Sequence, residues 1–237
     1  VMSYVSLSRG YKAGGFNLGV VPTGQRTFGD EVLWSVEAGV KTMLASNRLQ
    51  INAAAFYSRR DDQQVRISEQ INPNDPASFV FFTVNDTARG NVQGLEADLR
   101  WYASDAVELY ASLGLMSSEL GESGRDLAHA PRYSMSVGGV YRSVSGFFAR
   151  LDATARDEYF FDVTHDQKSQ AYELVNARVG FEGQDWRIEL WARNLFDEQY
   201  AVRGFYFGNE PPDFPPALYT RAGDPRHVGL TIERRFH

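Results

Sequence analysis

Apolar and polar residues alternate along most of this chain, and this alternation limits the folds that the chain can adopt. The clearest example lies within 147–156, where Phe147, Ala149, Leu151, Ala153 and Ala155 alternate with Arg150, Asp152, Thr154 and Arg156. A period of two residues places successive side chains on opposite faces of a β-strand. Similar segments recur throughout the 237 residues without a helical period, so we predict an all-β, antiparallel fold.

The alternating segments predict about eleven strands joined by turns and loops. They are expected at 1–10, 32–43, 48–60, 79–85, 90–101, 106–116, 132–142, 147–156, 171–181, 186–195 and 226–236, with 63–71 as an extension of the third. Short turns at 44–47, 102–105, 143–146 and 182–185 alternate with long connections at 11–31, 66–89, 117–131, 157–170 and 196–225. This alternation is typical of outer-membrane β-barrels, whose long loops are extracellular.

The charged residues determine which face of each strand can meet lipid. An arginine at the midplane of a bilayer costs ~2–4 kcal/mol, so the charged face must line a wet or protein-filled lumen. We predict that Leu109, Leu113, Leu151, Ala153 and Leu190 face lipid and that Glu96, Asp98, Arg150, Asp152 and Arg193 face the lumen. Aromatic residues near strand ends fit the girdles of such a barrel: Trp34, Trp101, Tyr102, Tyr141 and Trp186.

Composition argues against several other functions. No apolar run approaches the ~20 residues of a transmembrane helix, and the net charge of -6 argues against a nucleic-acid partner. The chain has no cysteine, and its histidines (His129, His165, His227 and His237) lack the spacing of a metal site. A Gly-x-Ser-x-Gly elbow is also missing from the sequence. We therefore predict no enzymatic activity, no cofactor and no metal site.

Several motifs resemble one family of outer-membrane proteins. The segment 194–200, Asn-Leu-Phe-Asp-Glu-Gln-Tyr, resembles an element on the penultimate strand of TonB-dependent receptors. Gly223-Asp224-Pro225-Arg226 resembles the opening of their last strand, which here ends at the aromatic Phe236. Further similar fragments occur in the family's order at 9–17, 37–41, 56–57 with 64–65, 94–96 and 130–132. Each fragment is short, and the ordered set covers the whole chain.

The resemblance implies an architecture and a location for the chain. Residues 1–237 would be the C-terminal portion of a barrel of about 22 strands, closed inside by an N-terminal plug that this sequence lacks. The short segment that binds the TonB energising complex would lie in the same missing region. The barrel would sit in the lipid of the bacterial outer membrane. The isolated chain is therefore expected to form an open half-barrel.

The implied function is energised uptake of a scarce nutrient such as a ferric siderophore, a small-molecule ligand captured by extracellular loops. Aromatic and basic residues of two long loops are the candidate ligand contacts: Tyr159, Phe160, Arg203, Tyr206, Phe207 and Arg221. Packing of these loops upon themselves over the barrel mouth would explain the same aromatic residues. A passive porin-like channel, a barrel adhesin and a soluble β-sandwich that binds carbohydrate are the alternative functions.

Overall fold

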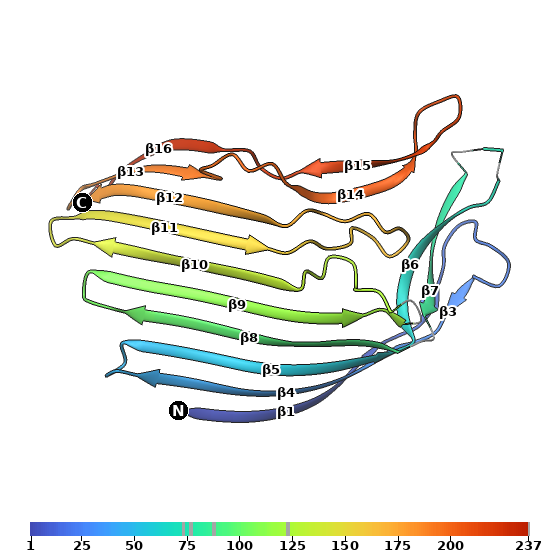
Figure 1. Ribbon diagram of the computed structural model, residues 1–237, viewed down its shortest axis with the longest axis horizontal. Helices are drawn as coiled ribbons and strands as arrows, with labels where there is room; N and C mark the ends of the chain where they lie inside the picture. Colours follow the sequence, from blue (N-terminus) through green and yellow to red (C-terminus); the bar gives the residue numbers. More distant parts are fainter. Residues whose placement is uncertain (73, 76–77, 87–88, 122–123, 237) are drawn as a thin grey trace.

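The computed structural model describes residues 1–72, 74–75, 78–86, 89–121 and 124–236, and its main feature is one curved antiparallel sheet (Figure 1). In the described part of the chain this sheet has ten strands, in the order β1 (Met2–Lys12), β4 (Glu31–Leu44), β5 (Leu49–Asp61), β8 (Gly90–Tyr102), β9 (Val107–Glu119), β10 (Tyr133–Arg142), β11 (Phe147–Arg156), β12 (Tyr172–Glu182), β13 (Trp186–Arg193) and β16 (His227–Arg234). The predicted all-β antiparallel fold is confirmed. The sheet is a partial barrel that does not close, since β1 and β16 are its two edges.

Smaller two-stranded sheets extend from the end of the main sheet where the long connections gather (Figure 1). They are β2 (Gly15–Phe16) with β3 (Thr27–Phe28), β6 (Gln63–Gln70) with β7 (Phe79–Asp86), and β14 (Ala201–Gly208) with β15 (Pro216–Ala222). Within the described ranges, no helix is long and apolar enough to cross a membrane.

The predicted strands need three corrections. The segment predicted as a strand at 79–85 is part of β7, and it pairs with β6 instead of joining the main sheet. The predicted extension at 63–71 is likewise separate from β5, because Asp62 has a φ of 55° and interrupts the strand. The hairpin β14–β15 was not expected, since 196–225 lacks a clear alternation and was predicted as a loop.

The two faces of the sheet divide as the alternation predicts. The register places Leu113 opposite Ala97 and Met135 on an apolar face, while Asp98 lies opposite Ser112 on a polar face. Hydrogen bonds cross the strands on the polar face, where the Tyr110 hydroxyl donates to Asp152. The same carboxylate accepts from the Arg150 guanidinium at 2.7 Å. All ten residues assigned from the sequence fall on their predicted faces.

The polar face also carries ion pairs that satisfy its most deeply placed carboxylate. Glu189 is 7% exposed. Its carboxylate oxygens lie 2.9 Å from Arg187 and 3.5 Å from Arg178. A buried carboxylate without such partners would be strongly destabilising. The arginines of this face are therefore part of the sheet's own charge balance.

Aromatic rings lie directly across from glycines at regular intervals on the polar face. Among the described residues these cross-strand pairs are Tyr4–Gly39, Phe56–Gly94, Tyr110–Gly138, Phe148–Gly180 and Trp191–Gly229. In the first four pairs, a Cβ built on the glycine would lie only 2.5–2.8 Å from the ring. Each ring thus occupies the space that a side chain on the neighbouring strand would need.

These aromatic–glycine pairs join only strands that are connected by long loops. The strand pairs β1–β4, β5–β8, β9–β10, β11–β12 and β13–β16 each contain one, whereas the described pairs β4–β5, β8–β9, β10–β11 and β12–β13, joined by short turns, contain none. A tight turn fixes the register of its own hairpin, but a long loop cannot. We conclude that the aromatic–glycine pairs specify register where the turn does not.

Substitution of one of these glycines should therefore destabilise the sheet. In Gly138→Ala the new methyl group would collide with the Tyr110 ring and displace the hydroxyl from Asp152. We expect a loss of ~1–3 kcal/mol in the free energy of unfolding, as for overpacked sites, measured by urea titration of the protein folded in detergent. Gly10→Ala is the matched control, because its Cβ would lie 3.6 Å from Leu33. Equal stability of the two variants would contradict this interpretation.

Candidate functional site

A groove of about 890 Å³ lies at the long-loop end of the sheet, between the hairpins β6–β7 and β14–β15. Its aromatic lining is Phe79, Phe81, Phe205, Tyr206, Phe207 and Phe214, and its ionisable lining is Arg66, Asp75, Asp162, His165 and Arg203. Figure 1 shows both hairpins projecting beyond the ends of the main strands. The groove therefore combines flat apolar surfaces with two guanidinium groups.

The wall formed by β14–β15 is rich in exposed aromatic side chains. Phe207 lies against Tyr219 of the neighbouring strand, with ring centroids 5.1 Å apart. The guanidinium carbon of Arg203 lies 5.1 Å from the centroid of the Phe205 ring. Phe205, Tyr206 and Phe207 all remain more than 40% exposed. Exposed rings held on a paired strand can stack on a ligand with little loss of side-chain entropy.

The motif at 194–200 holds the base of this wall. Asn194 is 4% exposed, and its side-chain amide donates to the carbonyls of Glu198 and Asp224 at 2.9 and 3.0 Å. Its side-chain oxygen accepts from the Glu198 amide at 2.8 Å. The Asp197 carboxylate accepts from the Arg226 amide at 2.8 Å. The two segments that flank the hairpin are thereby tied together where the hairpin leaves the sheet.

The opposite wall, β6–β7, is anchored by side-chain amides to the connection that precedes β4. The buried Asn17 forms two hydrogen bonds of 2.8 Å with the backbone of Thr83, one as donor and one as acceptor. Asn85 donates to the carbonyl of Asp62 at 2.8 Å and accepts from the amide of Gly29 at 2.6 Å. Such contacts give β6–β7 a defined position although it lies outside the main sheet. Phe79 and Phe81 consequently face the groove from a fixed backbone.

A third segment, 157–170, closes one end of the groove. Arg125 holds this segment by donating to the carbonyls of Asp162, Val163 and His165. Its guanidinium carbon lies 4.0 Å from the centroid of the Phe160 ring. The His165 ring is 5.8 Å from that of Tyr206, which links the segment to the β14–β15 wall.

The structure brings three of the six predicted contact residues together in the groove: Arg203, Tyr206 and Phe207. Tyr159 lies elsewhere; it is 5% exposed and its ring packs 5.3 Å from His129. Burial of Tyr159 raises the pKa of its hydroxyl above the ordinary value. Phe160 is covered by Arg125 and by Lys168, whose ammonium lies 4.5 Å from the ring centroid. Arg221 is exposed on β15, directly across from Arg203 and outside the groove lining.

Other lining residues escaped the sequence analysis. Phe79 and Phe81 were predicted as strand residues, and Arg66 as part of a strand extension, so they were not considered as ligand contacts. The signal that could have identified them is the aromatic run Phe79-Val80-Phe81-Phe82, in which Phe81 and Phe82 are adjacent and break the alternation of a membrane strand. His165 and Phe214 lie in loops without a distinctive local pattern.

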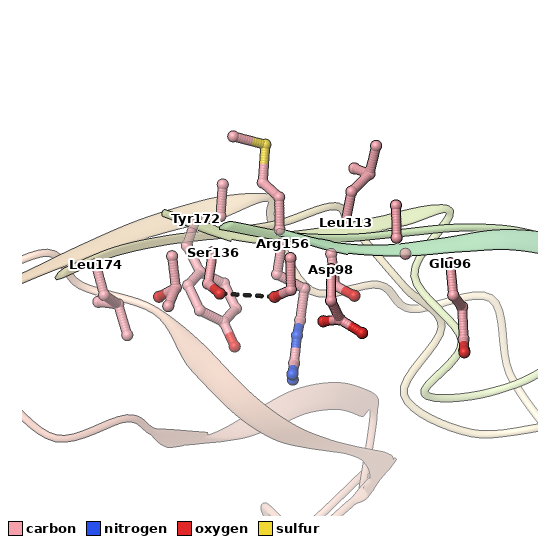
Figure 2. A pocket seen from close by; sticks show the side chains of 14 residues that line it. Glu96, Asp98, Leu113, Ser136, Arg156, Tyr172 and Leu174 are labelled. Atoms are coloured by element: carbon pink, nitrogen blue, oxygen red, sulfur yellow. Dashed lines mark hydrogen bonds between the residues drawn. The ribbon is translucent and has the colours of Figure 1, made fainter. Parts of the chain in front are cut away.

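The polar face of the main sheet has hollows of its own. Figure 2 shows one of about 490 Å³, in which Glu96, Asp98 and Arg156 point to the same side of the sheet and Leu113 points away. Ser112 and Ser136 share a hydrogen bond of 2.7 Å beside them. A second hollow of about 750 Å³ is lined by polar residues that include Arg150, Asp152, Arg178, Glu189 and Arg193. Within the described ranges no three His, Cys, Asp or Glu side chains converge to hold a metal ion; His237 lies outside these ranges.

The sequence of this chain matches the model of a known protein family. A model of the TonB dependent receptor-like β-barrel matches residues 1–195. The chain belongs to the TonB-dependent receptor family. Members of this family are outer-membrane receptors and transporters and not enzymes, so the predicted location in the outer membrane and the predicted lack of enzymatic activity are confirmed. The apolar face of the sheet is accordingly the face that meets lipid.

The individual relatives of this chain in the TonB-dependent receptor family are distant in sequence. The chain is 22% identical over 212 residues to a metal-pseudopaline receptor of Pseudomonas aeruginosa, covering 84% of this chain and 27% of that protein. It superposes on the ferric yersiniabactin uptake receptor of Yersinia pestis with a TM-score of 0.75 and 21% identity, over 99% of this chain and 35% of the other. For the siderophore receptor PiuA of Acinetobacter baumannii the TM-score is 0.74 and the identity 18%, over 98% and 33%. The chain thus spans about a third or less of these proteins, and the similarity in structure concerns the fold.

The role of the buried Asn194 side chain in positioning the hairpin β14–β15 can be tested by substitution. Asn194→Ala would leave several backbone groups without partners, and we expect a loss of ~1–3 kcal/mol in the free energy of unfolding. The hairpin should also become more sensitive to trypsin at Arg203 and Arg221. Gln199→Ala is the control from the same motif, because Gln199 is exposed and makes one bond of 3.3 Å. Identical cleavage rates in the two variants would argue against a role of Asn194 in positioning the hairpin.

Proposed function

We propose that this chain forms part of the wall of an outer-membrane receptor that captures a scarce nutrient, such as a ferric siderophore, for energised uptake. The observation that carries the proposal is the aromatic groove with Arg66 and Arg203 at the long-loop, extracellular end of a family barrel. Its volume of about 890 Å³ falls within the range of small-molecule sites, ~300–1,000 Å³. The relatives named above support the class of ligand, because their names refer to metal and siderophore receptors.

The chemistry of the groove favours a large ligand with flat and anionic parts. Aromatic rings offer stacking surfaces, and a guanidinium group can bind a carboxylate or phenolate oxygen through two parallel hydrogen bonds. Arg203, Tyr206 and Phe207 are proposed as direct contacts. Tyr159 and Phe160 would support the segment 157–170, and Arg221 would add positive charge on the outer side of β15.

The remaining parts of the machinery are proposed from the family. A plug domain would cover the polar face, where the hollows beside Asp98 and Arg150 offer charged and hydroxyl groups to a folded partner. A segment preceding that plug would bind the TonB complex, which would supply the energy. In this arrangement residues 1–237 are the C-terminal portion of the barrel.

Binding at the groove can be tested with ferric chelates of three classes: a catecholate, a hydroxamate and an aminocarboxylate. The full-length receptor in detergent is titrated with each chelate while its tryptophan fluorescence is recorded. For the chelate that the receptor binds, Arg203→Ala and Tyr206→Ala should each lower the affinity roughly tenfold or more, as for central contact residues. Glu210→Ala is the control, since Glu210 is exposed beside the groove but does not line it. Unchanged affinity in both groove variants would refute the assignment.

Energised uptake is separated from a passive channel by a second measurement. Cells that carry the receptor are given the radioactive ferric chelate with and without a protonophore. We expect the protonophore to abolish accumulation while surface binding persists, because only transport would need the energising complex. Accumulation that rises linearly with concentration and ignores the protonophore would instead identify a porin-like channel.

A further inference from the structure

The outward face of the sheet carries a row of basic and aromatic residues near its extracellular end. The register places Arg9, Trp34, Arg59 and Asn91 side by side on β1, β4, β5 and β8. These strands are neighbours at one edge of the sheet (Figure 1). By alternation from the lipid-facing Leu95 and Ala97, all four side chains point outward. This row is thus on the outer wall of the barrel and not in its lumen.

The height of the row matches the boundary of the hydrocarbon layer. Leu49 and Trp101, which pair at the short-turn end, are ten residues from Arg59 and Asn91 along their strands. At ~3.3 Å per residue and a tilt of ~40°, ten residues rise ~25 Å, the height of the apolar band of such barrels. The arginines therefore lie where the headgroups of the outward-facing leaflet begin.

The aromatic neighbours of the row agree with an interfacial position. The Arg9 guanidinium carbon is 5.7 Å from the centroid of the Trp34 ring, and Trp34 is 45% exposed. Tyr57, two residues nearer the membrane centre on β5, donates from its hydroxyl to the Asn91 side chain at 2.8 Å. Indole and phenol groups are typical of the level at which lipid headgroups begin.

The local charge is positive. Arg89 adds a third guanidinium above the row, and Asp61 accepts contacts from Arg59 at 3.0 Å and from Arg89 at 3.5 Å. Glu119 lies beyond Asn91 on β9. Arg9, Arg59 and Arg89 thus lie near two carboxylates, Asp61 and Glu119, and Arg59 and Arg89 share Asp61. Arg9 forms its ring contact with Trp34 and can offer its donors to an anion.

An apolar groove lies on the same strands, four residues nearer the membrane centre than the row. Its volume is about 610 Å³. Outward-facing alanines form its floor, and larger apolar residues border it: Val5, Ala38, Ala53, Ala55, Leu95, Ala97, Leu113 and Leu115. Val5 and Arg9 are four residues apart on β1, or ~13 Å along the strand. A headgroup at the row would therefore have its acyl chain over the alanine floor.

We propose that this outer wall binds one molecule of the phosphorylated, acylated glycolipid that forms the outward leaflet of bacterial outer membranes. Arg9 and Arg59 hold a phosphate group, Trp34 and Tyr57 contact the sugar, and an acyl chain lies in the groove between Val5 and Leu95. Charge complementarity and the level of the row select this occupant over a neutral lipid. The proposal concerns the lipid side of the wall and is independent of the nutrient and of the lumen.

The proposal is tested by native mass spectrometry of the receptor purified from outer membranes in detergent. The probes are diphosphorylated lipid A, the same lipid after enzymatic removal of its phosphates, and phosphatidylglycerol. We expect one diphosphorylated lipid A to remain bound. The double variant Arg9→Gln/Arg59→Gln should lower the affinity for lipid A roughly tenfold to thirtyfold, because each basic residue near a lipid surface contributes about 1 kcal/mol. Arg48→Gln, at the short-turn end beside Asp105, is the charge control.

The groove is tested by filling it. Ala55→Leu should weaken lipid A binding, whereas Ala153→Leu, outward-facing but outside the groove, should not. Arg9→Lys/Arg59→Lys keeps the charges and should retain most of the binding, and heat-modifiable gel mobility verifies that each variant is folded. Equal binding of dephosphorylated lipid A or of phosphatidylglycerol would overturn the choice of lipid. Unchanged binding in Arg9→Gln/Arg59→Gln or in Ala55→Leu would overturn the site itself.

Discussion

A charged side chain cannot face hydrocarbon at an acceptable cost, and the structure of this sheet depends on that constraint. One arginine at the wrong face would cost ~2–4 kcal/mol, and a register slip of one residue would turn every charged residue of a strand toward lipid. Arg150 and Asp152 on β11 must therefore share the face of Arg178 and Glu189. On that face Arg150 donates a hydrogen bond to Asp152, and Arg178 forms an ion pair with Glu189. On β11 to β13 the polar face is consequently neutralised in part by its own ion pairs.

The same constraint explains which parts of the fold could be predicted. Strand β11 was predicted with its observed bounds, because lipid on one side and polar groups on the other impose strict alternation on 147–156. Beyond the membrane that requirement ends. The hairpins β6–β7 and β14–β15 project beyond the ends of the main strands (Figure 1), and Phe205, Tyr206 and Phe207 on β14 follow one another without alternation. Their positions depend on hydrogen bonds of Asn17, Asn85 and Asn194 to other segments of the chain, which no local pattern reveals.

The candidate site was predicted in part for a related reason. Aromatic content selected Tyr206 and Phe207, which lie on β14 and line the groove, and it gave equal weight to Tyr159, which is buried. The difference between these tyrosines is three-dimensional: the Tyr159 ring packs against His129 and Phe161 and is 5% exposed, whereas Tyr206 packs against His165 and remains 41% exposed. Composition counts aromatic rings, but only tertiary contacts decide which rings are enclosed.

The alternation between tight turns and aromatic–glycine pairs separates two kinds of information in the chain. In the described sheet, the alignment of β11 with β12 is encoded in the wall by Phe148 and Gly180 and not by the segment 157–170 between them. Residues can be added to or removed from that segment without shifting the strands beside it. Natural variation can thus reshape the extracellular end of such a barrel, and with it the choice of nutrient, while the wall that crosses the membrane stays the same.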